Sequence, residues 1–144
     1  MRHTIAIANQ KGGVGKTTTA VNLSAALAAT KRKVLLVDLD PQGNASTAAG
    51  ANKNEKTLFE VYTQNLTIQD SILKSSGGYD VVPGGENLIA LEVAIRNQRK
   101  QGELKKLLTT LDYDFIILDT PPSLNQLTLE SLFAATATLI PLQC

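Results

Sequence analysis

Short apolar runs alternate along the chain with longer segments in which apolar residues recur at helical spacing. Five short runs are expected to be strands: 3–9, 33–39, 79–83, 113–119 and 137–142. Helical patterns are expected to form helices over 16–30, 86–100, 103–111 and 124–135. Two shorter helices are expected, one that begins at Thr57 with a capping box to Glu60 and runs to Tyr62, and one that runs from Thr67 to about Lys74. This order of elements predicts an α/β fold with a doubly wound, mostly parallel sheet.

The segments between these elements are expected to be irregular. Residues 45–56 are small and polar, which is typical of a mobile connector. Ser75 to Gly78 has the composition of a turn. The basic cluster at 31–33 is expected to end the first helix with favourable charge, and a phosphate-binding patch is the alternative.

Composition places the chain among globular proteins. It has 144 residues, of which 43% are hydrophobic and 19% charged, so we expect one domain over 1–144. Lys and Arg number 14 and Asp and Glu 13, so the net charge of +1 does not argue for nucleic-acid binding. The single cysteine, Cys144, cannot build a disulfide framework or a metal cluster, which fits a reducing cytoplasm.

A glycine-rich stretch, Lys11 to Thr18, joins the first strand to the first helix. Its glycines are Gly12, Gly13 and Gly15. In this context a Gly-Lys-Thr triplet predicts a phosphate-binding loop, in which Lys16 supplies a cation and the hydroxyl of Thr17 can ligate Mg²⁺. The usual pattern has glycine at position 10, where this chain has Gln10, and Lys11 adds a second lysine. The alternative is a glycine-rich turn with incidental lysines.

Three aspartates follow predicted strands. Asp38 and Asp40 end the second strand, and Asp119 ends the apolar run 115–118. The carboxyl ends of parallel strands are where such sheets bind ligands, and a carboxylate there can hold Mg²⁺ directly or through water. For Asp40 the alternative role is that of a turn residue before Pro41.

Three motifs together resemble the ParA/MinD family of deviant-Walker ATPases, most closely its chromosome-partitioning ParA (Soj) branch. They are K-G-G-x-G-K-T-T at 11–18, D-x-D-P-Q at 38–42 and a hydrophobic run followed by D-T-P-P at 119–122. The resemblance implies a P-loop NTPase-like fold. It covers all 144 residues but only the N-terminal part of a family chain, so we expect the domain to be truncated on its C-terminal side.

The resemblance also implies roles for the loop. Gly12, Gly13, Val14 and Gly15 would wrap the phosphates. Lys16 would neutralise the β- and γ-phosphates, Thr17 would ligate Mg²⁺ and Thr18 would contact the α-phosphate. Lys11 resembles the signature lysine that reaches the nucleotide of the partner subunit, an in-trans cation comparable to an arginine finger.

By the same resemblance, the acids and the last motif complete the site. Asp40 would orient the attacking water, with Asp38 behind it near the metal. Asp119 resembles the Walker B acid, so Thr17, Asp40 and Asp119 are the expected Mg²⁺ ligands. Pro121 and Pro122 resemble a switch that reports nucleotide state. The expected catalytic residues are therefore Lys11, Lys16 and Asp40.

The implied function is ATP hydrolysis in chromosome or plasmid partition. The family forms an ATP-dependent homodimer, a ParB-type partner stimulates hydrolysis, and its C-terminal part binds DNA nonspecifically. The expected location is the cytoplasm, in association with the nucleoid and without membrane binding.

Two alternatives remain open. The chain could be a truncated nucleotide-binding or interaction module without hydrolysis, or a MinD-like division-site ATPase, which would use a C-terminal amphipathic helix to reach the membrane. An iron-protein reductase needs cluster cysteines, which Cys144 alone does not supply. A GTPase would have Asp119-x-x-Gly, but position 122 is proline.

Overall fold

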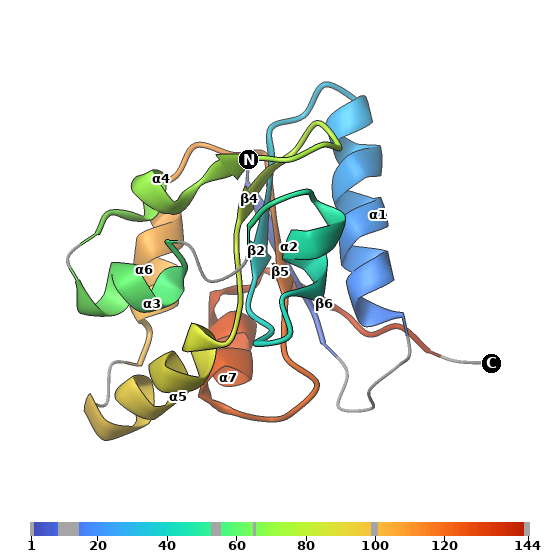
Figure 1. Cartoon of the computed structure of the whole chain (residues 1–144). Coiled ribbons are helices and arrows are strands. Elements are labelled where there is room, and N and C mark those ends of the chain that lie inside the picture. Colours follow the sequence, from blue (N-terminus) through green and yellow to red (C-terminus); the bar gives the residue numbers. More distant parts are fainter. Residues whose placement is uncertain (1, 9–14, 53–55, 65, 99–100, 143–144) are drawn as a thin grey trace.

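A computed structural model describes residues 2–8, 15–52, 56–64, 66–98 and 101–142. Within these residues a six-stranded sheet is covered by helices on both faces (Figure 1). The strands are β1 His3–Ile7, β2 Val34–Asp38, β3 Leu73–Lys74, β4 Asp80–Val82, β5 Phe115–Asp119 and β6 Ala137–Leu139. The helices are α1 Lys16–Ala29, α2 Asn44–Ala48, α3 Leu58–Thr63, α4 Ile68–Ser71, α5 Asn87–Gln98, α6 Glu103–Thr109 and α7 Gln126–Ala134.

The sheet order is β3-β4-β2-β5-β1-β6, and every pairing is parallel except that of β3 with β4. The carboxyl ends of the central strands lie in register, because Asp119 is opposite Ile7 on one side and opposite Asp38 on the other. β2, the next strand after β1 in the sequence, lies on one side of β1 with β5 between the two strands. The last strand, β6, lies on the other side of β1. This reversal of winding direction is where doubly wound sheets bind ligands.

Successive residues of the central strands pack into two separate cores. Leu35 and Val37 face the core beneath α3, α5, α6 and α7, whereas Val34 and Leu36 face the core beneath α1 and α2. The alternation follows from the pleat of a strand, which points neighbouring side chains to opposite faces. In Figure 1, α1 accordingly stands on one side of the strands, and α3, α5, α6 and α7 lie on the other.

Local signals set several helix starts. The Thr57 side chain caps α3, and the Glu60 carboxylate returns a bond to the Thr57 backbone, which confirms the capping box that the sequence predicts. Asn125 caps α7 through a bond from the backbone N–H of Thr128. Gly15 and Gly43 precede α1 and α2 in the left-handed conformation that glycine adopts without strain.

The structure corrects several sequence-based expectations. Residues 44–48 in the expected connector form α2, because Ala45 and Ala49 bury their side chains in the same core as α1. The helix beginning after Thr67 does not reach Lys74 but ends at Ser71, and Leu73–Lys74 pairs with β4. The predicted five strands thus become six, with one antiparallel edge. The strands at 3–9 and 137–142 are also shorter than predicted, ending at Ile7 and Leu139 among the described residues.

Beside β6, apolar side chains remain in contact with solvent. The most exposed large ones on α7 and on the chain around β6 are Phe133, Ile140 and Leu142. Leu132 and Leu139 are exposed as well, to a smaller extent. Of the helices in the described ranges, none has the length and apolar character required to cross a membrane.

Candidate functional site

The first turn of α1 meets the end of β5 in a buried polar cluster. The Lys16 ammonium lies 3.0 Å from Oδ1 of Asp119, and the Thr17 hydroxyl donates a 3.0 Å hydrogen bond to Oδ2 of the same carboxylate. Asp119 is fully buried, and Lys16 is only 7% exposed. Parallel pairing of β1 with β5 contributes to this meeting, because it places Asp119 opposite Ile7, the last residue of β1.

Asp40 forms the other wall of the cluster. Its Oδ2 lies 3.9 Å from the Lys16 ammonium, and its Oδ1 accepts a hydrogen bond from the backbone N–H of Gln42. Asp40 is 5% exposed, so one lysine faces two shielded carboxylates. Asp40 is therefore a turn residue, which was the alternative role considered for it, and its carboxylate also faces the Lys16 ammonium.

Asp38 lies at the end of β2, beside Asp119. Its carboxylate oxygens form hydrogen bonds with residues that follow β2, namely Asp40 and Ser46. Oδ1 accepts the backbone N–H of Asp40, and Oδ2 accepts both the N–H and the hydroxyl of Ser46. Burial raises the pKa of Asp38 to about 6; the Ser46 hydroxyl opposes this rise and the charge of Asp119 adds to it. Burial also raises the pKa of Asp119, although the nearby Lys16 opposes the rise.

The remaining predicted site residues fall into two groups. Gly15 has φ 77° and forms the turn into α1, Thr18 is exposed one residue after Thr17, and Pro121 is buried just beyond β5. Lys11, Gly12, Gly13 and Val14 lie outside the described residues. The structure therefore brings together Gly15, Lys16, Thr17, Asp40 and Asp119, with Asp38 directly behind Asp40.

Two polar residues at this edge of the sheet were missed by sequence reasoning. Thr120 is fully buried and directs both its backbone N–H and its hydroxyl to the carbonyl of Ile7, at the end of β1. Ser46 is fully buried against Asp38. A Thr inside the D-T-P-P motif could have been flagged as a tie to the neighbouring strand, but nothing in the spacing of Ser46 from Asp38 signals their contact.

The chemistry of the cluster suits a phosphate anion with a hard cation. A positive side chain stands at the start of a 14-residue helix, whose N–H groups and dipole favour an anion there. The hydroxyl of Thr17 and the carboxylates of Asp119 and Asp40 are oxygen donors of the kind that Mg²⁺ prefers. In the described ranges no three His, Cys, Asp or Glu side chains gather into a metal site.

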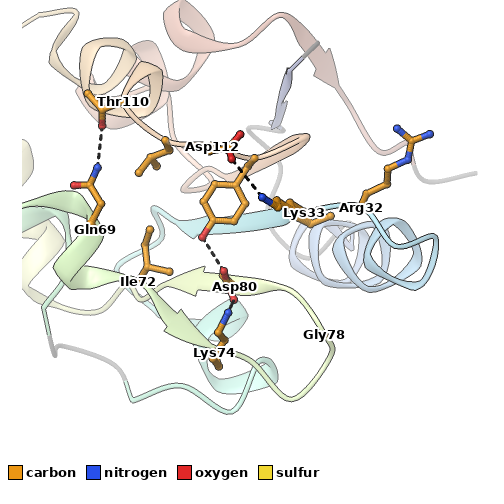
Figure 2. A pocket seen from close by; sticks show the side chains of 12 residues that line it. Arg32, Lys33, Gln69, Ile72, Lys74, Gly78, Asp80, Thr110 and Asp112 are labelled. Atoms are coloured by element: carbon orange, nitrogen blue, oxygen red, sulfur yellow. Dashed lines mark hydrogen bonds and ion pairs between the residues drawn. The ribbon is translucent and has the colours of Figure 1, made fainter.

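A hollow of about 470 Å³ lies at the opposite end of the sheet from this cluster, among the residues that lead into β2, β4 and β5 (Figure 2). Arg32, from the basic cluster at 31–33, lines it. Carboxylates neutralise two other cations of the hollow: Lys33 pairs with Asp112 at 3.3 Å, and Lys74 pairs with Asp80 at 3.0 Å. This pairing does not favour the phosphate-binding alternative for the basic cluster.

Comparison with known proteins identifies the family. The family model AAA_31, described as an AAA domain, matches residues 2–144. The chain belongs to this AAA domain family. Among curated proteins, this AAA domain is 43% identical over 148 residues to the chromosome partitioning protein ParA of Caulobacter vibrioides, which covers 97% of the chain and 55% of that protein. It is 42% identical over 146 residues to the sporulation initiation inhibitor protein Soj of Bacillus subtilis, covering 97% of the chain and 58% of that protein.

The resemblance to the ParA (Soj) branch is thereby confirmed for this AAA domain. The chain spans little more than half the length of these curated relatives. Among solved structures, it superposes with a TM-score of 0.94 and 37% identity on cobyrinic acid a,c-diamide synthase from Mycobacterium smegmatis with a bound ATP analogue and magnesium. That match covers 100% of the chain and 61% of the synthase, and it confirms the P-loop NTPase-like fold class.

Proposed function

We propose that the chain binds ATP with Mg²⁺ and hydrolyses it as a ParA-type partition ATPase. The observation that carries the proposal is the buried cluster in which Lys16, Thr17 and Asp119 meet at the start of α1. Two kinds of relatives support it: the proteins named ParA and Soj, and the solved synthase with its ATP analogue and magnesium. The name of the latter describes a synthase, so its likeness supports the nucleotide site rather than the partition role.

In this proposal, the chain supplies positioning and charge neutralisation, which are the main requirements of phosphoryl transfer. Lys16 binds the β- and γ-phosphates, and Gly12, Gly13, Val14 and Gly15 wrap them. Thr17, Asp40 and Asp119 would hold Mg²⁺, and Oδ2 of Asp40 lies 3.9 Å from the Lys16 ammonium. Mg²⁺, when bound, neutralises charge on the phosphate oxygens. Thr18 contacts the α-phosphate.

Asp40 orients the water that attacks the γ-phosphate. Its carboxylate fits this role because the Gln42 backbone fixes one oxygen and the other faces Lys16. Lys11 completes the site of a second copy, so hydrolysis requires an ATP-dependent homodimer. Pro121 and Pro122, in the loop after Asp119, report the nucleotide state to partners.

The biological role proposed is chromosome or plasmid segregation in the cytoplasm, on the nucleoid. A ParB-type protein stimulates hydrolysis, and nonspecific DNA binding belongs to the part of the family chain that follows this one. These assignments rest on the relatives named ParA and Soj.

A second candidate is a module that binds nucleotide without hydrolysing it, because the likeness to the solved synthase with its ATP analogue and magnesium supports the nucleotide site alone. One experiment separates the two. Titration with ATP and Mg²⁺ should raise the unfolding temperature, because a ligand present at 100 times its Kd stabilises the folded state by about 2.7 kcal/mol. Release of phosphate from the same samples supports the ATPase, and a thermal shift without release supports the module. No shift at millimolar ATP would contradict both.

A further inference from the structure

A buried serine connects three separate segments behind the proposed catalytic aspartate. The Ser46 hydroxyl donates a 2.6 Å hydrogen bond to Oδ2 of Asp38 and accepts a 2.8 Å bond from the backbone N–H of Gly84. Ser46 lies in α2, Asp38 ends β2, and Gly84 follows β4. Ser46 and Asp38 are both fully buried, so solvent does not compete for these bonds.

Gly84 makes this contact possible through its lack of a side chain. A Cβ at this position would lie 2.8 Å from the carbonyl oxygen of Asp38 and 2.9 Å from its carboxyl carbon. Both distances are shorter than real Cβ atoms tolerate, and the carbonyl belongs to the backbone of a central strand. The chain after β4 therefore approaches Asp38 closely enough to bond Ser46 only because residue 84 is glycine.

The contacts continue from Asp38 to Asp40. With Oδ2 occupied by Ser46, the Asp38 carboxylate directs Oδ1 to the backbone N–H of Asp40 at 3.0 Å. Asp40 in turn accepts the N–H of Gln42 on its own carboxylate and the N–H of Gly43 on its carbonyl. The turn that presents Asp40 to Lys16 is thus fixed from behind by a carboxylate that Ser46 holds in one orientation.

We propose that Ser46 is a positioning residue for ATP hydrolysis: it orients Asp38, which fixes the turn that carries Asp40. This inference rests on the proposed function for its catalytic consequence. Asp38 then acts through its contacts with the chain, behind the site, rather than as a direct ligand of nucleotide or metal. Loss of the Ser46 hydroxyl should lower turnover and leave ATP affinity nearly intact, because Lys16 and Thr17 do not contact Ser46 among the described interactions.

The test compares Ser46→Ala with Ser71→Ala in the same chain. Ser71 is a matched control because it is also fully buried in a short helix, and its hydroxyl donates only to the carbonyl of Ile68 in the described structure. For Ser46→Ala we expect kcat to fall about tenfold or more, the usual effect of removing a residue that orients a catalytic group, with less than about a threefold change in Kd for ATPγS with Mg²⁺. Ser71→Ala should lower thermal stability by about as much as Ser46→Ala does, but it should leave kcat unchanged.

Hydrogen exchange of the nucleotide-free protein gives a readout that does not require hydrolysis. In Ser46→Ala, the amides of Asp40, Ser46 and Gly84 should exchange faster, whereas in Ser71→Ala they should exchange as in the parent. A parent chain that hydrolyses no ATP would overturn the proposed function, and the exchange data would still decide whether Ser46 fixes the Asp40 turn. Equal kcat values and equal exchange at residues 38–46 in the two variants would overturn the positioning role.

Discussion

The Lys16 ammonium and the Asp119 carboxylate lie 3.0 Å apart in the protein interior, although the two residues are 103 positions apart in the sequence. Asp119 is fully buried, so this pair joins the start of α1 to the end of β5 in surroundings that screen charge weakly. The pair therefore links two segments that are distant in the sequence, and the loss of either charge would leave the other buried without its partner.

Replacing Lys16 with alanine should abolish ATP binding and destabilise the fold. Removal of the cation leaves Asp119 buried without its charge partner, which costs on the order of 3 kcal/mol. Lys33→Ala is the control, because the Lys33 pair with Asp112 is exposed and its loss should change the free energy of unfolding by less than about 0.5 kcal/mol. Calorimetric titration with ATPγS and urea unfolding measure the two effects. Parental ATP affinity in Lys16→Ala would rule out the phosphate-loop assignment.

Replacing Asp40 with alanine should preserve ATP binding and remove hydrolysis. The Asp40 carboxylate stands 3.9 Å from the lysine, beyond hydrogen-bond distance, so Lys16 keeps its shorter contact with Asp119. Asp112→Ala, a change at an exposed carboxylate, serves as the control. Phosphate release under saturating ATP is the measurement. Turnover of Asp40→Ala at the parental rate would remove Asp40 from the mechanism.

Titration of Asp38 should appear in the pH dependence of stability. Burial raises its pKa from 3.8 to about 6, so the folded protein binds this proton more tightly than the unfolded chain. The resulting stabilisation is fully present below pH 3.8 and is lost as pH rises through about 6, by an amount on the order of 3 kcal/mol. Urea unfolding of the parent and of Asp38→Asn between pH 3.5 and about 7 measures it. A constant difference in the free energy of unfolding across this range would show that Asp38 keeps its ordinary pKa.

The buried carboxylate of Glu130 should stabilise α6 from outside that helix. Its oxygens accept the backbone N–H groups of Gly102 at 2.7 Å and Leu104 at 3.3 Å, at the start of α6. We expect Glu130→Ala to lower the free energy of unfolding by about 2 kcal/mol, because hydrogen bonds to charged groups are the stronger ones. Glu130→Gln should cost less, since its amide keeps one acceptor, and Glu86→Ala, at an exposed position, should cost little. Equal unfolding curves for the three variants would contradict this helix cap.

The parts of the molecule that sequence predicts are those with strong periodicity or an established motif. β2, α1 and β5 could be located because their apolar runs and helical spacing are clear. Lys16 and Asp119 could be identified as site residues because each lies in a motif that indicates phosphate or Mg²⁺ binding. α2 escaped prediction because its five residues are small and polar, and its burial depends on α1. β3 has only two residues, and its existence depends on pairing with β4.

The residues behind the site could not be predicted, because tertiary contact alone gives them their role. Ser46 lies eight residues after Asp38, but the two residues belong to different elements, β2 and α2, so no single periodicity relates them. Gly84 looks like an ordinary turn glycine beside Pro83, and only the approach of its backbone to Asp38 shows why a side chain is excluded.

The bonds of Thr120 to Ile7 have a mechanical consequence. The carbonyl oxygen of Ile7 receives both the amide and the hydroxyl of Thr120, at 3.3 and 2.8 Å. One carbonyl oxygen therefore ties the last residue of β1 to the residue that follows β5. A displacement of either strand end would lengthen both hydrogen bonds, so these bonds resist movement of one strand end relative to the other.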